Sequence, residues 1–283
     1  MHNVPHWKRQ SGISNKELNV MDIKQLFDLK SNIALITGGA GYLGRYMVEA
    51  LAEAGAHVII ADAQLDRANE IAQSMRSQKL QVDAVEYDAA SGDSIKAMVQ
   101  KVHSNYGAID ILVNGAYKFI EHRIDDATAE DFDETLKIGV TGYFLVSQKV
   151  AELMKQKKQG SIINIASMYG MVGSYPDVYK DLPACISPNY HAAKGAIIQM
   201  TRYMSVYWAA HNIRVNAISP GPFPQDKVRQ NVPGLIERLE KKVPLGRVGK
   251  PEELKGAIVF LASNASSFVT GHNLVVDGGW TAW

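Results

Sequence analysis

Seven short apolar runs alternate with longer amphipathic segments along the 283 residues, and this alternation restricts the fold more than any other feature. Most runs are β-branched and apolar on both faces, as in parallel strands covered by helices on each side. They span residues 33–37, 57–62, 81–88, 110–115, 161–167, 213–219 and 273–278. The segments between them predict crossover helices over residues 43–54, 64–78, 92–105, 130–157, 191–210 and 251–263. We therefore expect an α/β fold with one doubly wound, parallel, seven-stranded sheet and helices on both faces.

The length and the uninterrupted pattern predict a single domain over residues 28–283, preceded by an N-terminal arm of residues 1–27. The first twenty residues are polar and lack the apolar block of a signal peptide. The arm is expected either to be loose or to pack on a neighbouring subunit. Cys185 is the single cysteine, so an intrachain disulfide is impossible and the chain fits a reducing compartment. We expect a cytoplasmic protein.

The charge balance argues for a small or weakly charged partner. The chain carries 30 basic and 29 acidic residues, which leaves no electrostatic footprint for nucleic acid or an anionic membrane. No stretch approaches the roughly 18 uninterrupted apolar residues of a transmembrane helix. The eight histidines and the cysteine do not follow a metal-ligand spacing. We therefore expect a small-molecule substrate, no metal, no nucleic acid and no membrane association.

The stretch TGGAGYLG (37–44) follows the first predicted strand and precedes a helix. Glycines at such a turn allow a pyrophosphate to approach the backbone N–H groups and the positive end of the helix dipole. One spacing, G-x-G-x-x-G, uses Gly39, Gly41 and Gly44. Another, T-G-x-x-G-x-x-G, uses Gly38, Gly41 and Gly44. Either spacing predicts a dinucleotide site, and the alternative is a merely tight turn.

Polar residues at the next strand ends refine this prediction. Asp62 ends the second run, where a carboxylate accepts hydrogen bonds from ribose hydroxyls and repels a 2′-phosphate, so NAD(H) is favoured over NADP(H). Asp88 is suited to bind an adenine amino group or simply to cap the helix near Ser91. Asn114 and Ala116, at the end of the fourth run, are suited to hold strand ends together and to contact the adenine ribose.

The stretch NYHAAKG places Tyr190 and Lys194 four residues apart, on one face of a predicted helix. A phenol titrates near pH 10 and needs a nearby cation before it exchanges protons readily at neutral pH. Lys194 supplies that cation. Ser167, at the end of the fifth run, offers a hydroxyl that can orient a carbonyl or alcohol oxygen. The three residues predict acid–base chemistry at such an oxygen.

Together these motifs resemble the short-chain dehydrogenase/reductase family over residues 28–280. INIAS resembles the strand that carries the catalytic serine, YHAAK its tyrosine and lysine, and RVNAISPG the turn near the nicotinamide. FVTGHNLVVDGG resembles the C-terminal strand. The resemblance implies a Rossmann-like fold, with Tyr190 as the general acid/base, Lys194 lowering its pKa and binding ribose, and Ser167 positioning the substrate oxygen.

The implied reaction is interconversion of a secondary alcohol and a ketone by hydride transfer to or from NAD. The resemblance also implies a substrate lid over residues 222–250 and a homotetramer or homodimer. It favours the register through Gly38, Gly41 and Gly44. The implied cofactor-binding residues are Gly38, Gly41, Tyr42, Leu43, Gly44, Asp62, Asp88, Ala89, Asn114, Ala116, Tyr190, Lys194, Pro220 and Gly221.

Three departures from the family pattern concern single positions. Tyr42 stands where the penultimate glycine of T-G-x-x-x-G-x-G is usual, so the turn resembles that of the extended members. In NGAY, Tyr117 replaces a small residue and is expected to narrow the cofactor or substrate cleft. Gly139 aligns with the asparagine that helps hold a relay water, which opens the alternative of a less active enzyme or pseudo-enzyme.

A fourth departure is an insertion, because 23 positions separate Ser167 from Tyr190 and the family usually has about ten fewer. It is either a solvated surface loop or a substrate-binding segment that stacks on and hydrogen-bonds a polyhydroxylated ring. We favour a sugar, polyol or sugar acid as the substrate. The candidate residues in the insertion are Tyr169, Tyr175, Asp177, Tyr179, Lys180 and Asp181.

Two other functions stay open at this stage. One is a non-catalytic dinucleotide-binding sensor or scaffold, which Gly139 and Tyr117 suggest. The other is a 3-oxoacyl reductase of lipid synthesis, which normally requires NADPH and an apolar or carrier-facing entrance. Asp62 and the polar insertion argue against the second.

Overall fold

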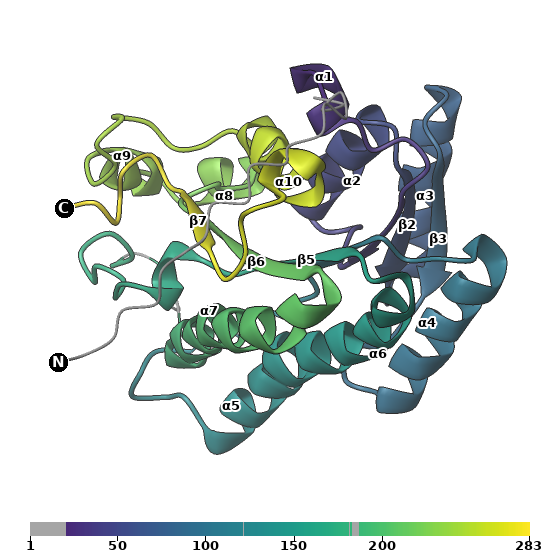
Figure 1. Ribbon diagram of the computed structural model, residues 1–283. Coiled ribbons are helices and arrows are strands. Elements are labelled where there is room, and N and C mark those ends of the chain that lie inside the picture. The colour runs from purple at the N-terminus through teal and green to yellow at the C-terminus, as the bar shows by residue number, and fades with distance from the viewer. Residues whose placement is uncertain (1–20, 121, 181, 183–186) are drawn as a thin grey trace, which may run out of the picture.

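One parallel sheet of seven strands forms the centre of the protein in the computed structural model, which describes residues 21–120, 122–180, 182 and 187–283 (Figure 1). The strand order is β3-β2-β1-β4-β5-β6-β7. The strands are β1 (Ile33–Thr37), β2 (His57–Asp62), β3 (Val82–Glu86), β4 (Ile111–Asn114), β5 (Gly160–Ile165), β6 (Ile213–Pro220) and β7 (Asn273–Val276). The predicted α/β fold is confirmed as a Rossmann-like, doubly wound sheet. Most of the N-terminal arm, Asp181 and Cys185 lie outside the described residues.

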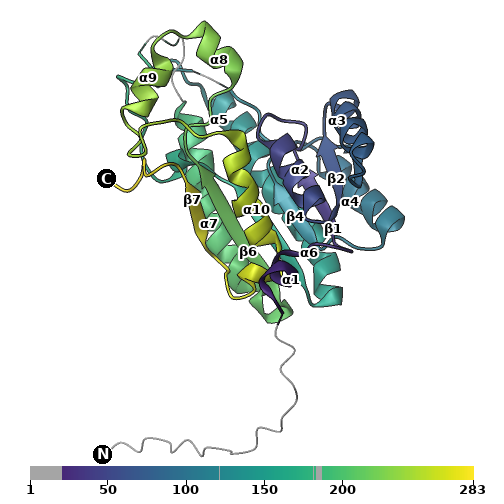
Figure 2. The ribbon, with the colours of Figure 1, turned by 90° about the horizontal axis from the view of Figure 1, so that it is seen from above.

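Helices cover both faces of this sheet (Figure 2). They are α1 (Ile23–Phe27), α2 (Gly44–Glu53), α3 (Leu65–Ser77), α4 (Gly92–Tyr106), α5 (Ala129–Leu136), α6 (Gly142–Lys157), α7 (Pro188–Trp208), α8 (Asp226–Asn231), α9 (Leu235–Glu240) and α10 (Lys255–Ala262). No helix in the described ranges is long and apolar enough to cross a bilayer.

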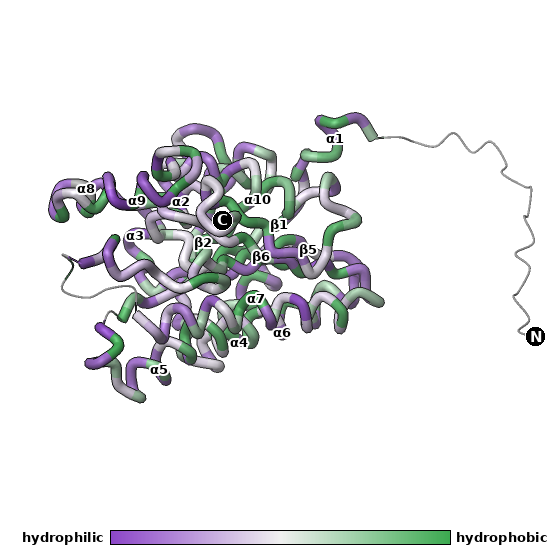
Figure 3. The backbone as a smooth tube through the Cα atoms, turned by 90° about the vertical axis from the view of Figure 1, so that its left-hand side faces the viewer, coloured by the Kyte–Doolittle hydropathy of each residue, from purple (hydrophilic) through white to green (hydrophobic). Residues whose placement is uncertain are grey.

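The sheet separates two apolar cores. On one face, strand side chains pack against α2, α3 and α10 through residues such as Leu51, Met75 and Ile258. On the other face they pack against α4, α6 and α7 through residues such as Met98 and Met154. Figure 3 shows the hydrophobic strands in the interior and hydrophilic stretches along the outer helices. Burial on both faces explains why the strand sequences are apolar throughout.

The strand order reverses between β1 and β4, which lie side by side. The chain leaves β1 toward β2 and β3 on one side, and leaves β4 toward β5, β6 and β7 on the other. Thr37 is in register with Asn114, which is in register with Asn164, so three strand ends stop at one level. A crevice outside the carboxyl ends of the strands at such a reversal is the usual ligand position in this type of sheet.

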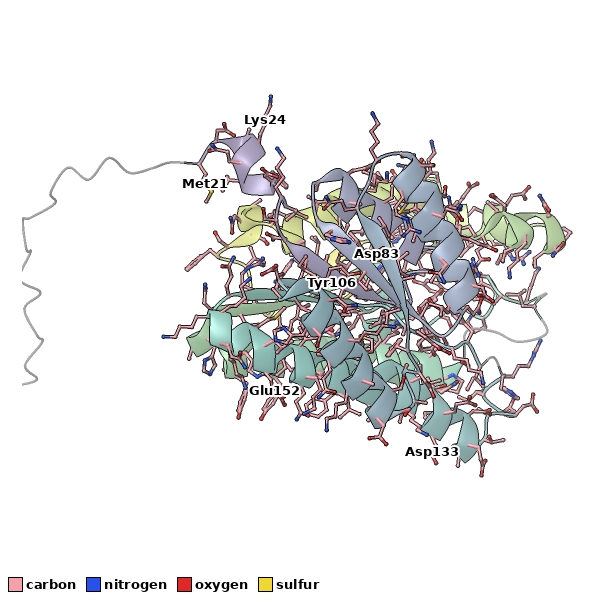
Figure 4. The ribbon with its side chains drawn as sticks, turned by 90° about the vertical axis from the view of Figure 1, so that its right-hand side faces the viewer. Met21, Lys24, Asp83, Tyr106, Asp133 and Glu152 are labelled. Carbon is pink, nitrogen blue, oxygen red and sulfur yellow. The ribbon has the colours of Figure 1, made fainter. Side chains whose placement is uncertain are left out.

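A polar cluster ties the β3 edge of the sheet together, far from those strand ends (Figure 4). The Asp83 carboxylate accepts a hydrogen bond from the Tyr106 hydroxyl at 3.0 Å and lies 2.8 Å from His57 Nε2. Burial raises the pKa of Asp83, but the hydrogen bonds from His57 and Tyr106 outweigh it, so the pKa is lowered. The cluster joins β2, β3 and α4.

The segment predicted as one helix over 130–157 is interrupted. Between α5 and α6 lies a π-helical segment, η1 (Lys137–Thr141), in which the N–H of Gly142 donates to the carbonyl of Lys137. π-helical turns inside helices often occur at functional sites. Gly139, at the centre of this segment, is buried. The extra residue shifts the helical register between α5 and α6.

A buried hydrogen-bond network connects β4 and β5 to the helices beneath them. Asn114 Nδ2 donates to Ser147 Oγ and to Asn164 Oδ1, both at 2.9 Å. Asn164 Nδ2 donates to Thr201 Oγ1 at 2.9 Å. These side chains are at most 1% exposed. Asn114 thus holds strand ends together, as its position at the end of the strand suggested.

Replacing the central amide of this network, Asn164→Leu, is expected to lower the free energy of unfolding by about 2–4 kcal/mol, because Asn114 and Thr201 each lose a buried partner. Thr201→Val is the control, since it removes one bond to the amide and is expected to cost about 1 kcal/mol. Urea denaturation measures both. Equal losses for the two variants would contradict a network centred on Asn164.

Candidate active site

The glycine loop is packed so closely that two of its positions exclude any side chain. Gly38 has a φ of +69°, and a Cβ on it would lie 2.7 Å from the Cα of Ala116. A Cβ on Gly44 would collide with the carbonyl oxygen of Gly38. A Cβ on Gly39 would instead meet core side chains, among them Ile60 at 3.1 Å. Gly38 and Gly44 therefore bring the loop, the end of β4 and the start of α2 together, while Gly39 faces the core.

Asp62 lies beside this loop at the end of β2. Its Oδ2 accepts a hydrogen bond from the N–H of Ala40 at 3.1 Å, and its Oδ1 accepts one from the N–H of Gln64 at 3.0 Å. The carboxylate is partly exposed. A negative charge is thus fixed next to the glycine loop, on the side of β2.

Tyr42 connects the glycine loop to the segment predicted as a lid. Its hydroxyl donates to the carbonyl of Pro224 at 3.2 Å. Leu43, the next residue, is the N-cap of α2. The segment that follows Pro224 carries the short helices α8 and α9. The tyrosine at the unusual position therefore joins two parts of the site that lie 182 positions apart.

Asp88 and Ala89 follow β3. Asp88 is exposed, and its Oδ1 accepts from the N–H of Ala90 at 2.8 Å. The cap of α4 is Ser91, whose Oγ accepts from the N–H of Ser94 at 3.2 Å. Asp88 therefore shapes the turn and is not the helix cap, contrary to one of the two roles expected for it.

Pro220 and Gly221 lie at the end of β6, held by the neighbouring strand. The N–H of Gly221 donates to the carbonyl of Val276 at 2.9 Å. A Cβ on Gly221 would lie 2.5 Å from the Cα of Asp277, so only glycine allows this approach. The two residues thus face the same strand-end edge as the glycine loop.

Ser167, Tyr190 and Lys194 come together at the end of β5. Ser167 lies two residues beyond the strand, accepts from the N–H of Tyr169 at 3.2 Å and is hydrogen-bonded to Tyr190. Tyr190 lies in the first turn of α7, which begins at Pro188, and Lys194 lies one turn later. Lys194 Nζ donates to the carbonyl of Ile165 at 2.8 Å. The hydroxyl pair and the ammonium thus lie at one strand end.

The pKa of Tyr190 differs from the sequence-based expectation. Burial raises it above the usual value of a phenol, and the hydrogen bond with Ser167 lowers it by less. Burial also lowers the pKa of Lys194 to about 7. Desolvation thus disfavours both charged forms in the protein without cofactor. The lowering of the Tyr190 pKa by the Lys194 ammonium stays a prediction.

Tyr117 and Gly139, two of the unusual positions, are in direct contact. A Cβ on Gly139 would lie 3.1 Å from Cδ2 and Cε2 of the Tyr117 ring. That separation is tighter than ordinary van der Waals contact. The ring thus occupies the space beside η1 into which a side chain at position 139 would extend. The large residue at 117 and the absent side chain at 139 form one packing unit.

The sequence did not identify two aromatic residues of this site. The Phe119 ring stacks on Tyr190 with centroids 5.8 Å apart and is 63% exposed. The Tyr143 ring is buried, with Lys194 Nζ 5.8 Å from its centroid. Phe119 could have been found from its position two residues after Tyr117, because alternate residues of an extended segment share a side. Tyr143 could have been found from its position four residues after Gly139, because residues four apart lie on the same side of a helix.

The insertion between Ser167 and Tyr190 is not a fully solvated loop. Tyr169, Val178 and Tyr179 are buried and pack with Leu239 of α9 and with Trp280. The Tyr169 and Tyr179 hydroxyl oxygens are 2.5 Å apart. Tyr175, Asp177 and Lys180 lie on the exposed side of the segment. Of the two interpretations left open, the structure supports a packed segment with a solvated outer edge.

His191 and Trp280 hold the insertion against the site. His191 Nε2 accepts from the N–H of Ser174 at 3.1 Å, while its Nδ1 lies 2.9 Å from the carbonyl of Ser187. The Trp280 ring contacts Tyr169 and Tyr175, and its buried Nε1 has no hydrogen-bond partner among the residues that the structure describes. Burial raises the pKa of Tyr179 to about 12, so its hydroxyl stays protonated near neutral pH.

No group of three or more histidine, cysteine, aspartate or glutamate side chains suited to a metal ion occurs among the residues that the structure describes. The site consists instead of a glycine loop, hydroxyls and one ammonium at the carboxyl ends of parallel strands. This is the architecture of a nucleotide-binding oxidoreductase.

Comparison with known proteins identifies the family. Residues 39–281 match the family profile described as Enoyl-(Acyl carrier protein) reductase. The chain belongs to the short-chain dehydrogenase/reductase family, and it is an oxidoreductase that acts on CH–OH groups.

Two curated relatives illustrate the range of similar proteins. The 5-keto-D-gluconate 5-reductase of Escherichia coli K12 is 36% identical over 259 residues, covering 91% of this chain and 98% of the relative. The 3-oxoacyl-[acyl-carrier-protein] reductase of Thermotoga maritima is 34% identical, covering 89% of this chain and 98% of the relative.

A solved structure shares the fold. The gluconate 5-dehydrogenase from Burkholderia cenocepacia J2315, crystallised in complex with NADP and tartrate, superposes with a TM-score of 0.82 at 34% identity. The match covers 92% of this chain and 99% of that structure. The similar proteins therefore include a 5-keto-D-gluconate reductase, a gluconate dehydrogenase and a 3-oxoacyl-[acyl-carrier-protein] reductase.

Gly139→Asn is expected to destabilise the protein by about 1–3 kcal/mol, because the new side chain meets the Tyr117 ring. Adding Tyr117→Gly removes that contact, so the double variant is expected to be more stable than Gly139→Asn alone. Thermal unfolding of the two single variants and the double variant measures this coupling. Additive losses would show that the two positions are independent.

Proposed function

We propose that the protein is an NAD-dependent oxidoreductase that interconverts a secondary alcohol and a ketone, with Tyr190 as general acid/base. The observation that carries the proposal is the meeting of Ser167, Tyr190 and Lys194 at the end of β5, next to the glycine loop. A hydroxyl donor–acceptor pair beside a cation suits proton exchange at an oxygen whose carbon gains or loses hydride.

The loop geometry fits a dinucleotide. Gly38 and Gly44 leave a close, side-chain-free backbone turn in front of the start of α2, which is the cradle that a pyrophosphate needs. In this proposal Gly41, Tyr42 and Leu43 would complete the turn and Pro220 and Gly221 would line the nicotinamide pocket. The residues that would bind the adenosine half are Asp62, Asp88, Ala89, Asn114 and Ala116. When bound, NAD(H) supplies hydride exchange.

The protein side chains handle the proton. For ketone reduction, Ser167 orients the carbonyl oxygen and Tyr190 donates its hydroxyl proton to the oxygen that becomes the alcohol. For oxidation the same proton returns to Tyr190. Lys194 favours the phenolate while it is an ammonium, and it loses that charge as the pH rises through about 7. Reduction is therefore supported below that pH and declines above it.

Asp62 supports NAD over NADP. Its carboxylate is fixed by Ala40 and Gln64 beside the loop, where it can accept hydrogen bonds from ribose hydroxyls. The same charge opposes a 2′-phosphate at that position. The related gluconate 5-dehydrogenase was crystallised with NADP, so the choice between the two cofactors has to be measured.

A sugar, polyol or sugar acid is the substrate class that the insertion favours. It brings the Tyr169 and Tyr179 hydroxyls close to Tyr190, and Trp280 adds an indole N–H that has no partner within the described part of the chain. Aromatic faces with a few convergent hydrogen-bonding groups suit a polyhydroxylated molecule. The 5-keto-D-gluconate 5-reductase relative supports the same class.

We also propose a homotetramer or homodimer. Tyr203, Val206 and Tyr207 of α7 are 66%, 80% and 64% exposed, and the two tyrosine rings stack 6.0 Å apart. An exposed apolar strip on a long helix is typical of an interaction surface.

Residues 222–250 are proposed to act as the substrate lid. Helix α9, which lies in this segment, packs on the insertion.

Tyr190→Phe is expected to reduce turnover at least about 10²-fold, because the proton donor is lost, while NADH binding is retained. The assay uses NAD⁺ with sugars, polyols, sugar acids and hydroxysteroids, NADH with the corresponding ketones, and a 3-oxoacyl thioester. Tyr203→Phe, on the same helix but exposed, is the matched control.

Each outcome of this panel separates the candidates. Turnover of a sugar-derived alcohol supports the proposal, and turnover of the thioester alone supports the 3-oxoacyl reductase. NADH binding without any turnover supports a sensor or scaffold. Full activity of Tyr190→Phe would contradict the assigned acid/base.

Asp62→Asn is expected to change cofactor choice, because the amide keeps an oxygen for the N–H of Ala40 but loses the charge. Wild type is expected to bind NADH more tightly than NADPH, and the variant to narrow that ratio about tenfold, which corresponds to about 1.4 kcal/mol. Nucleotide fluorescence measures both constants. Tighter binding of NADPH to wild type would overturn the assignment.

A further inference from the structure

Lys194 is a buried cation whose surroundings are almost entirely aromatic. It is 4% exposed, and its Nζ lies 4.8 Å from the ring centroid of Tyr117, 5.6 Å from that of Tyr190 and 5.8 Å from that of Tyr143. Its hydrogen bond is to the carbonyl of Ile165. These distances are within the range of cation–π attraction, and Tyr117 is the nearest ring.

The rings that face the ammonium come from three parts of the chain. They are Tyr117 after β4, Tyr143 of α6 and Tyr190 of α7. Burial raises the pKa of Tyr143 and of Tyr190, so these two hydroxyls stay protonated near neutral pH. No ion pair to Lys194 is present in the part of the chain that the structure describes. The buried charge is therefore stabilised by the Ile165 carbonyl and by the faces of these rings.

Tyr117 reaches this position because position 139 has no side chain. Its ring lies against Gly139 of η1 and crosses the ring of Tyr190 edge-on, with centroids 5.2 Å apart and planes at 87°. It is thus in contact with both the tyrosine and the lysine of the site. Phe119 also stacks on Tyr190, but the Lys194 cation–π contacts in the described structure are with Tyr117, Tyr143 and Tyr190 and not with Phe119.

We infer that Tyr117 is a positioning residue, whose ring occupies the space left by Gly139 and holds the ammonium of Lys194 charged beside Tyr190 through a cation–π contact. The catalytic consequence rests on the proposed function, whereas the effect on the lysine charge does not. The ring thus stabilises the ammonium in place of a carboxylate, which Lys194 lacks among the described residues. This makes the two unusual residues at positions 117 and 139 a functional pair.

The direct test is the titration of Lys194 in protein labelled with ¹³C at lysine Cε, followed by NMR without cofactor or substrate. Lys194→Met assigns the signal. Tyr117→Leu removes the ring face and is expected to lower the midpoint by roughly half a unit to one unit. Tyr117→Phe keeps the face and is expected to move it by much less. Phe119→Leu, which removes a neighbouring ring without a contact to Lys194, is expected to leave the midpoint unchanged.

A second ring-free variant protects the test against misfolding. If Tyr117→Leu fails to fold, the Tyr117→Gly/Gly139→Asn protein replaces it, and its midpoint is also expected below that of Tyr117→Phe. An unchanged midpoint in a folded ring-free variant, or a shift as large in Phe119→Leu, would overturn the inference.

Kinetics separate this inference from the proposed function. In ketone reduction, the decline of kcat with rising pH is expected to begin at lower pH in Tyr117→Leu than in Tyr117→Phe, by the same amount as the NMR midpoint. A midpoint shift in a protein without turnover would refute the proposed function and leave the inference intact. Turnover in wild type, with no midpoint shift in Tyr117→Leu, would support the proposed function and refute the inference.

Discussion

The ammonium of Lys194 is buried without a carboxylate partner among the described residues, and the rest of the site is arranged around it. Removing a charge from water costs several kcal/mol unless polar groups or rings compensate. The Ile165 carbonyl accepts a hydrogen bond from the ammonium, and the rings of Tyr117, Tyr190 and Tyr143 lie around it. The low pKa that results leaves the lysine close to half-charged near pH 7, so small changes around it change the charge of the site.

The sheet makes this arrangement possible. Thr37 and Asn114 end β1 and β4 in register with Asn164, which is one residue before the end of β5, and the buried amide network fixes that level. The glycine loop lies beyond β1 and the serine beyond β5, so both lie at the carboxyl-terminal edge of the sheet. The insertion packs against α9 and Trp280 beside this edge.

Much of the fold could be predicted from the sequence because its signals are local. β1 and β2 have the predicted bounds, and the helices differ from prediction by a few residues. The interruption at η1 could not be predicted, since the run of residues 130–157 is amphipathic throughout and the extra residue depends on contacts with Tyr117 and Ala89. The raised pKa of Tyr190 could not be predicted for a related reason: a spacing of four residues indicates proximity to Lys194 but contains no information about desolvation.

The sequence by itself determined the alternation of strands and helices, the glycine turn, the acidic end of β2 and the spacing of Tyr190 and Lys194. Each of these depends on neighbouring residues or on a helical repeat, and both are visible in the order of the chain. Only the tertiary structure decided that Tyr117 fills the space beside Gly139, that Phe119 and Tyr143 belong to the site and that Tyr169, Val178 and Tyr179 of the insertion are buried. Those facts depend on which segments meet across the sheet, because desolvation and ring contacts arise between residues that are distant in sequence.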